Sequence, residues 1–334
     1  MELYHYRYKK LDYILEEVEQ KNAYINEYRL IYRSPYPTGI KTNDRVNVRL
    51  FLNKNKSKKN TTYIKNNHIL ILIHGFSSKN KSMDNYYRFI DKMNENNLSC
   101  AFMNLPFHLN RTPDGEKSGK RLLYFDDMET LQFFHQCVVD VKKLISILAK
   151  ILTFKRIYIC GISLGSMVSL ITMANDNRIS KGVFIIGGGN WEEIHWKGIL
   201  RFALKGNCTC GEKKYKDKTN REACREIYSS FPIFLKKIKE IKPDKIRMDL
   251  KNLPDLKRVT TKMCFLCDPL AFAYRIQPEK VLMINSKFDF YFSKDSSEQL
   301  WEELGKPKIL WLNKMHSSKI LTDKKIIKEI TSFL

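Results

Sequence analysis

Short apolar segments alternate with helical stretches from residue 68 to the end of the chain. Residues 68–73 and 156–162 are apolar almost throughout, as strands buried on both faces are. Residues 131–152 instead repeat their apolar side chains at helical spacing. Because parallel strands are joined by crossover helices, the alternation predicts a doubly wound, mostly parallel α/β sheet. The expected strands are 68–73, 99–105, 156–162, 182–186, 281–284 and 308–312, and the expected helices are 83–96, 131–152, 164–174, 294–304 and a last one ending at residue 334.

Residues 190–278 break this alternation. They are basic, rich in cysteine and helical in pattern, and such a long interruption of a compact domain is usually functional. We interpret them as a helical cap insertion between the two parts of the core, residues 68–189 and 279–334. The cap aromatics are expected to pack the cap, and an apolar face of the cap would also suit an acyl chain; they are Trp191, Trp196, Phe202 and Phe231.

Residues 1–67 form the N-terminal part of the core. The spacing of apolar residues predicts a helix over 7–20, and strands are expected at 25–33 and 46–52. A polar loop rich in Lys and Asn follows at 53–67. The whole chain of 334 residues, with 43% hydrophobic residues, is long enough for one large domain.

The chain is strongly basic, with 59 Lys and Arg against 36 Asp and Glu, a net charge of +23. Such an excess attracts nucleic acid or an anionic membrane surface, although an AT-rich genome gives the same bias. No nucleic-acid-binding motif accompanies the charge, so no nucleic acid partner is expected. The first ten residues lack a cleavable apolar leader, and no apolar run could span a bilayer. We therefore expect a cytoplasmic protein with mostly reduced cysteines.

Ser163 lies between two glycines, in Gly161-x-Ser163-x-Gly165, where an expected strand meets an expected helix. This spacing is typical of a sharp turn that pushes a serine hydroxyl out of the sheet. The glycines let strand and helix approach without a Cβ clash, and the helix N-terminus favours negative charge. The pattern predicts that Ser163 is a nucleophile.

Acyl transfer at such a serine needs two N–H donors for the developing oxyanion. In folds with this turn, one donor is the residue after the nucleophile, here Leu164, and the second follows an earlier strand. Residues 71–78 fit that place, and the N–H of Phe76 is the candidate. The pair His74-Gly75 taken alone is equally consistent with an ordinary turn at the end of a strand.

A histidine base and an acid should follow Ser163 in the order Ser, acid, His. Only His195 and His316 follow it, and His316 stands directly after the last expected strand. Asp289 stands at the tip of the turn after the preceding strand, where it would orient the imidazole. Asp295 is the alternative acid, but it suits a helix N-terminus better.

The segment LPFHLNRTPDGEKSG at 105–119 resembles the alpha/beta-hydrolase-domain-eighteen type of α/β-hydrolase. The turn at Ser163, the segment DPLAFA at 268–273 and the strand before Asp289 agree with it. The resemblance implies an α/β-hydrolase fold, an esterase- or lipase-like activity and no cofactor. Met315 and Ser166 depart from the family, whose members often carry glycine at these positions; neither change removes a catalytic group.

Three side chains near the strand ends are candidates for substrate binding: His74, His108 and Arg111. Arg111 would bind a carboxylate or phosphate of the substrate. Alternatively, it holds its own loop by bonding backbone carbonyls. The sequence leaves both roles open.

The cap cysteines form no recognised metal module. Their spacing, Cys208-x-Cys210, Cys224 and Cys264-x-x-Cys267, is irregular, so separate thiols are expected rather than zinc, and no metal or other cofactor is predicted.

The sequence predicts a serine hydrolase that cleaves a small-molecule or lipid carboxylic ester through an acyl-enzyme. A phospholipase, a thioesterase or a peptidase could use the same three residues, and a non-catalytic binding protein could keep the scaffold. An anionic membrane surface stays open as a partner.

Overall fold

The computed structural model describes residues 4, 11–22, 25–53, 67–76, 80–152, 154–206, 212–240 and 259–334. Its described strands form one nine-stranded sheet in the order β1-β2-β3-β5-β4-β6-β7-β8-β9. The neighbouring strands β5, β4, β6, β7, β8 and β9 are parallel to one another. β3 pairs antiparallel with β5, β2 antiparallel with β3, and β1 antiparallel with β2. The strand bounds are β1 Ile14–Asn22, β2 Ile25–Arg33, β3 Arg45–Asn53, β4 Asn67–Ile73, β5 Leu98–Met103, β6 Phe154–Ile162, β7 Ile179–Ile185, β8 Val281–Phe288 and β9 Lys308–Met315.

Helices cover both faces of the parallel sheet, and the alternation of side chains along β4 shows how. Ile69, Ile71 and Ile73 join the core cluster under α3 and α4, whereas Leu70 and Leu72 join the cluster under α2 and α11. Successive residues of a strand point to opposite faces, so a continuous apolar strand supplies both cores. The predicted doubly wound, mostly parallel α/β fold is confirmed. The core helices are α1 Lys41–Asp44, α2 Asn80–Glu95, α3 Asp127–Ile151, α4 Leu164–Ala174, α10 Lys294–Glu303 and α11 Lys324–Phe333.

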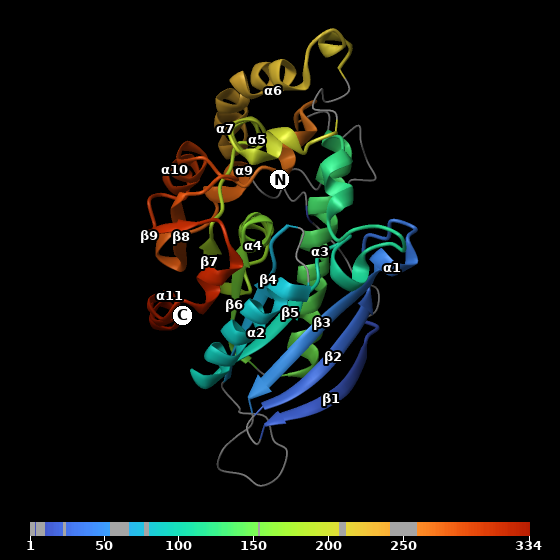
Figure 1. The fold of residues 1–334 in the computed structure, drawn as a ribbon, viewed down its shortest axis with the longest axis vertical. Helices are drawn as coiled ribbons and strands as arrows, with labels where there is room; N and C mark the ends of the chain where they lie inside the picture. The colour runs from blue at the N-terminus through green and yellow to red at the C-terminus, as the bar shows by residue number, and fades with distance from the viewer. Residues whose placement is uncertain are drawn as a thin grey trace.

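The segment between β7 and β8 is helical in its described parts. Figure 1 shows α5, α6 and α7 gathered at one end of the molecule, with β1, β2 and β3 at the opposite end. Short 3-10 helices join these elements. The bounds are α5 Trp191–Trp196, α6 Asn220–Ser229, α7 Phe231–Glu240 and α9 Leu270–Ala273, with 3-10 helices at Ile199–Phe202, Lys213–Tyr215, Met263–Cys267 and Pro278–Lys280; elsewhere 3-10 helices lie at Leu109–Arg111, Lys120–Tyr124 and Ser318–Thr322.

The buried carboxylate of Asp268 ties the two ends of this segment and helix α6 together. It accepts N–H groups from Asn190, Trp191 and Leu270 at 2.9–3.2 Å, and the Tyr228 hydroxyl at 2.9 Å. Burial raises the pKa of Asp268 to about 6. Four donors on one carboxylate fix the place where the chain leaves β7 and begins α5.

Two expectations about local structure are wrong. The helix expected over 7–20 is instead the strand β1 in its described part, and residues 5–10 lie outside the described residues. Ile14 and Leu15 point to opposite faces and are 53% and 39% exposed, so neither face of β1 is buried enough to impose a strand-like alternation. Pairing with β2 overrides the helical spacing. Phe202, expected to pack the cap, is 72% exposed. The polar loop expected at 53–67 lies outside the described residues from 54 to 66.

Candidate active site

Ser163 lies at the junction of β6 and α4, on a strained turn. Its φ of 57° and ψ of −123° lie in a region that L-residues rarely adopt. A Cβ on Gly165 would lie 2.3 Å from the carbonyl oxygen of Ile73, and one on Gly161 would lie 2.1 Å from that of Gly165. Gly165 is therefore needed for the close approach of helix α4 to the end of strand β4, and Gly161 for the close approach of α4 to strand β6.

Ser163, His316 and Asp289 form a chain of hydrogen bonds. His316 Nε2 lies 2.9 Å from Ser163 Oγ, and His316 Nδ1 lies 2.7 Å from Asp289 Oδ2. The three residues come from the ends of β6, β8 and β9, as expected for parallel strands whose carboxyl ends meet at one edge. The sequence prediction that these three side chains converge agrees with the geometry.

The carboxylate of Asp289 is held by its own turn. Its other oxygen, Oδ1, accepts the N–H groups of Tyr291 and Phe292 at 2.8 and 3.0 Å. The rings of these two residues pack on the His316 imidazole, with centroids 4.5 and 5.9 Å away. The carboxylate and imidazole side chains are only 4% and 13% exposed, so they are largely shielded from water. Asp295 lies in the first turn of α10, whose N-terminus is capped by Ser293.

The residues whose backbone amides are expected to stabilise an oxyanion, Phe76 and Leu164, lie close to Ser163. Leu164 is the first residue of α4, and Phe76 lies three residues beyond the end of β4. A Cβ on Gly75 would lie 3.2 Å from Ser163 Cβ, so the chain before Phe76 passes directly against the serine. Both residues line the same cavity as the Ser163 side chain.

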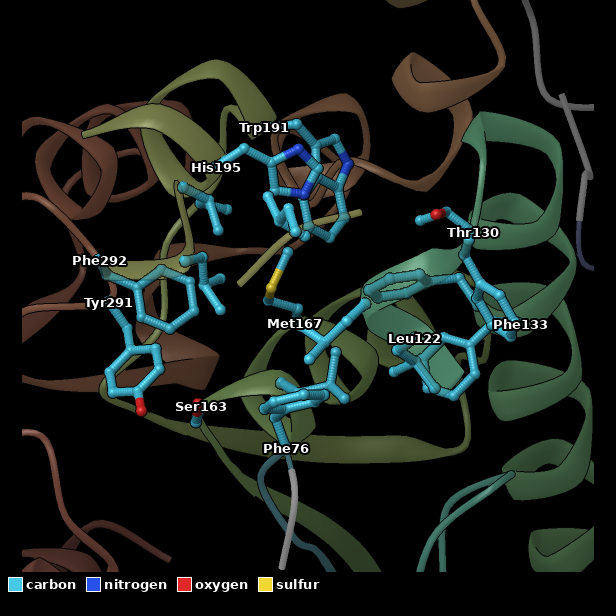
Figure 2. A pocket seen from close by; sticks show the side chains of 17 residues that line it. Phe76, Leu122, Thr130, Phe133, Ser163, Met167, Trp191, His195, Tyr291 and Phe292 are labelled. Carbon is cyan, nitrogen blue, oxygen red and sulfur yellow. The ribbon is translucent and has the colours of Figure 1, made fainter. Parts of the chain in front are cut away.

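An apolar cavity of about 100 Å³ opens beside Ser163. Figure 2 shows Phe76 beside the serine, Tyr291 and Phe292 on one side, Thr130 and Phe133 on the other, and Trp191 with His195 across from it. No Lys, Arg, Asp or Glu of the described chain lines it. Its walls come from four segments: Phe76; Leu122, Leu123, Phe125, Thr130, Phe133 and Phe134; Ser163, Leu164, Met167, Trp191, Ile194, His195, Leu200 and Leu204; and Tyr291 and Phe292.

His195 contributes one of the few polar groups on the cavity wall. Burial lowers the pKa of His195 to about 4, so its imidazole is neutral at pH 7. Its position between two tryptophans in the sequence gave no sign of this placement. Tyr291, Phe292 and the wall from α3 were likewise not predicted, because only the folded chain brings these segments to the serine.

The histidines proposed for substrate binding lie behind the cavity wall. His74 is fully buried; its Nε2 accepts the Leu105 N–H at 3.0 Å and its Nδ1 donates to the Gly75 carbonyl at 2.8 Å. His108 is also fully buried and bonds the Pro106 carbonyl at 2.7 Å. Burial lowers the pKa of His74 to about 3 and that of His108 to about 4, so both rings stay neutral.

Arg111 is likewise fully buried and does not line the cavity. It donates to the carbonyls of Asn43 and Asn104 at 2.8 and 3.0 Å and pairs with Asp140 on α3 at 2.9 Å. Of the two roles that the sequence left open, this geometry is that of loop support. The substrate contact predicted for His74, His108 and Arg111 is therefore corrected to a structural role.

The described residues contain no group of three or more His, Cys, Asp or Glu side chains placed to hold a metal ion. Cys224, Cys264 and Cys267 are buried, and Cys208 and Cys210 lie outside the described part of the chain. None of the described helices is long and apolar enough to cross a bilayer.

A nine-stranded mixed sheet with helices on both faces and a serine on this turn defines an α/β hydrolase. The model of the family alpha/beta hydrolase domain containing 18 matches residues 53–333, and the chain belongs to that family. The resemblance in the sequence is confirmed.

Solved structures of similar fold include esterases. Acetyl xylan esterase 1 from Thermoanaerobacterium sp. JW/SL YS485 is 18% identical with a TM-score of 0.59, over 96% of this chain and 86% of that one. An acetyl xylan esterase from Paenibacillus sp. R4 is 12% identical with a TM-score of 0.59, over 98% and 90%. A cold-adapted esterase from an Arctic intertidal metagenomic library is 12% identical with a TM-score of 0.52, over 94% and 97%. At these identities the likeness shows the fold alone. The comparison with curated proteins found no match.

Gly165→Ala tests the close approach of α4 to β4. We expect a lower melting temperature, because the added methyl would meet the backbone carbonyls of Ile73 and His74 at 2.3 and 2.5 Å. Gly115→Ala is the control, since its Cβ would meet open space; its positive φ should cost only about 1 kcal/mol. Equal behaviour of the two variants would contradict the packing argument.

Arg111→Met tests the buried ion pair. Leaving Asp140 buried without its partner should lower the free energy of unfolding by about 3–5 kcal/mol, measured by urea denaturation. Arg121→Met breaks an exposed pair with Glu116 and should cost at most about 1 kcal/mol. If Arg111→Met instead kept full stability and raised KM alone, Arg111 would be a substrate ligand.

Proposed function

We propose that this protein is a serine carboxylic ester hydrolase that works through an acyl-enzyme. The observation that carries the proposal is the hydrogen-bonded chain from Ser163 Oγ through His316 to Asp289, at 2.9 and 2.7 Å, beside an apolar cavity. Because the Asp289 carboxylate accepts a hydrogen bond from the Nδ1–H group of His316, Nε2 is left as the basic nitrogen that faces the serine hydroxyl.

In the first half of the reaction, Ser163 Oγ attacks the ester carbonyl carbon and its proton passes to His316 Nε2. Asp289 stabilises the imidazolium that forms. The N–H groups of Phe76 and Leu164 would donate to the oxyanion. The tetrahedral species then collapses: the bond to the alkoxy oxygen breaks, and the Nε2 proton goes to the leaving alcohol.

In the second half, water replaces the alcohol. It gives a proton to His316 Nε2 while its oxygen attacks the acyl carbon, and the proton returns to Ser163 Oγ as the acid leaves. The reaction consumes one water and releases one alcohol and one acid.

The cavity favours an uncharged apolar acyl group. Its described lining carries no ionised side chain, and its polar side-chain groups are those of Thr130, Ser163, Trp191, His195 and Tyr291. A phospholipase, a thioesterase or a peptidase would use the same steps at Ser163, so a panel of ester, thioester and peptide substrates separates these activities. The solved structures of similar fold are named as esterases, which agrees with ester chemistry but carries less weight than the site.

Ser163→Ala should lower kcat/KM on a short nitrophenyl ester by about 10⁴-fold or more, because the substitution removes the oxygen that forms the acyl-enzyme. The wild-type protein should react with a fluorophosphonate probe, and the variant should not. Ser229→Ala, an exposed serine on α6, is the control. Unchanged hydrolysis by the purified Ser163→Ala protein would contradict the proposal. If the wild-type protein reacts neither with esters nor with the probe, the result would favour a non-catalytic binding protein.

Asp289→Asn should lower kcat by about 10⁴-fold with little change in stability, because the amide reverses the hydrogen bond to Nδ1 and sets the wrong imidazole tautomer. Asp295→Asn, six residues away in the first turn of α10, is the matched control and should keep near wild-type kcat. A larger loss at Asp295 than at Asp289 would reassign the acid.

A further inference from the structure

Exposed apolar side chains gather at the mouth of the cavity. Among the described residues with large exposed apolar side chains, six lie within two residues of a cavity-lining or triad residue. We call these six the mouth rim: Tyr124, Ile199, Phe202, Phe288, Phe290 and Met315. The remaining four are Ile14, Leu15 and Val18 on β1 and Ile233 on α7. Scattered exposed apolar residues are ordinary on a surface, but a cluster around one cavity is not.

Backbone contacts bring the segments of the mouth rim together. Phe288 and Met315 are direct partners in the β8–β9 register. The Ile199 N–H donates to the Phe290 carbonyl at 2.7 Å. The loop before and after Tyr124 is joined to the same cap segment, because Lys205 and Gly206 donate to the Leu123 carbonyl at 2.6 and 3.1 Å. The rim is thus a connected border of the cavity that holds Ser163.

Cations accompany these apolar side chains. Residues 197–206 contain Lys197, Arg201 and Lys205 and no acidic residue, and residues 313–319 contain Lys314 and Lys319 and no acidic residue. The Arg201 guanidinium lies over the Phe202 ring, 4.6 Å from its centroid. The one acid of residues 286–292, Asp289, is engaged by His316. Of these cations, Lys197 pairs with Glu193 and Lys314 with Asp323. Asp126 and Asp127 follow Tyr124, so the positive charge of the rim lies on residues 197–206 and 313–319 and not beside Tyr124.

We propose that the mouth rim docks the protein on a lipid layer with anionic headgroups, which places the cavity mouth against the layer. Aromatic side chains insert at the boundary between headgroups and acyl chains, and nearby Lys and Arg are attracted to anionic headgroups. An ester held in the layer would then reach Ser163 along apolar walls, without crossing water. The docking itself does not depend on catalysis; only the delivery of an ester rests on the proposed function.

Cosedimentation with vesicles tests the docking. The Ser163→Ala protein is used so that no vesicle is altered during the measurement, and the vesicles are phosphatidylcholine alone or phosphatidylcholine with phosphatidylserine. We expect retention on the phosphatidylserine vesicles that weakens as salt is raised. Adding Phe202→Ser and Phe290→Ser should weaken it by about tenfold or more, because two exposed rings are lost. Adding Ile14→Ser and Val18→Ser on β1 should leave it unchanged.

Absence of binding to the phosphatidylserine vesicles would overturn the proposal. So would equal binding to both kinds of vesicle, or an equal loss in the mouth-rim and β1 variants. The same paired substitutions in the wild-type background should keep the hydrolysis of a water-soluble nitrophenyl ester. If the wild-type protein does not hydrolyse the nitrophenyl ester, that result would count against the proposed function and would not affect the conclusion about vesicle binding.

Discussion

The site depends on how closely helix α4 approaches the end of strand β4. Glycine at 165 lets the helix backbone lie against the carbonyls of Ile73 and His74, and glycine at 161 lets the strand turn beneath it. Ser163 is thereby held at a positive φ at the edge of the sheet, 2.9 Å from the His316 imidazole. The strain in this turn is offset by the packing of α4, which is buried along nearly its whole length.

A second layer of buried polar contacts supports the loops behind that turn. Arg111 joins the loop after β5 to α3 through Asp140, while Asn43 donates to Gln136 on α3 and accepts the Phe107 N–H. On the other side, Asp268 fixes the start of α5, which carries Trp191 and His195 onto the cavity wall. The reacting groups lie on strand ends, and the shape of the cavity is set by loops that these networks hold.

Most of the fold could be predicted because buried parallel strands and covering helices leave strong periodic signals. Ser163, Asp289 and His316 could be placed because each follows a recognisable strand in the order that this fold requires. Strand β1 could not be predicted from the sequence, since both of its faces carry exposed apolar residues. The role of Arg111 could not be decided either, because its partner Asp140 is adjacent only in the folded chain. The cavity walls from α3, α5 and residues 291–292 also needed the tertiary structure.

Trapping the acyl-enzyme tests the central claim most directly. A short nitrophenyl ester mixed with the protein and quenched in acid should give a burst of one nitrophenol per protein, and peptide mass spectrometry should find the acyl group on Ser163. Steady hydrolysis without a burst and without an adduct, or an acyl group on a different residue, would contradict the account.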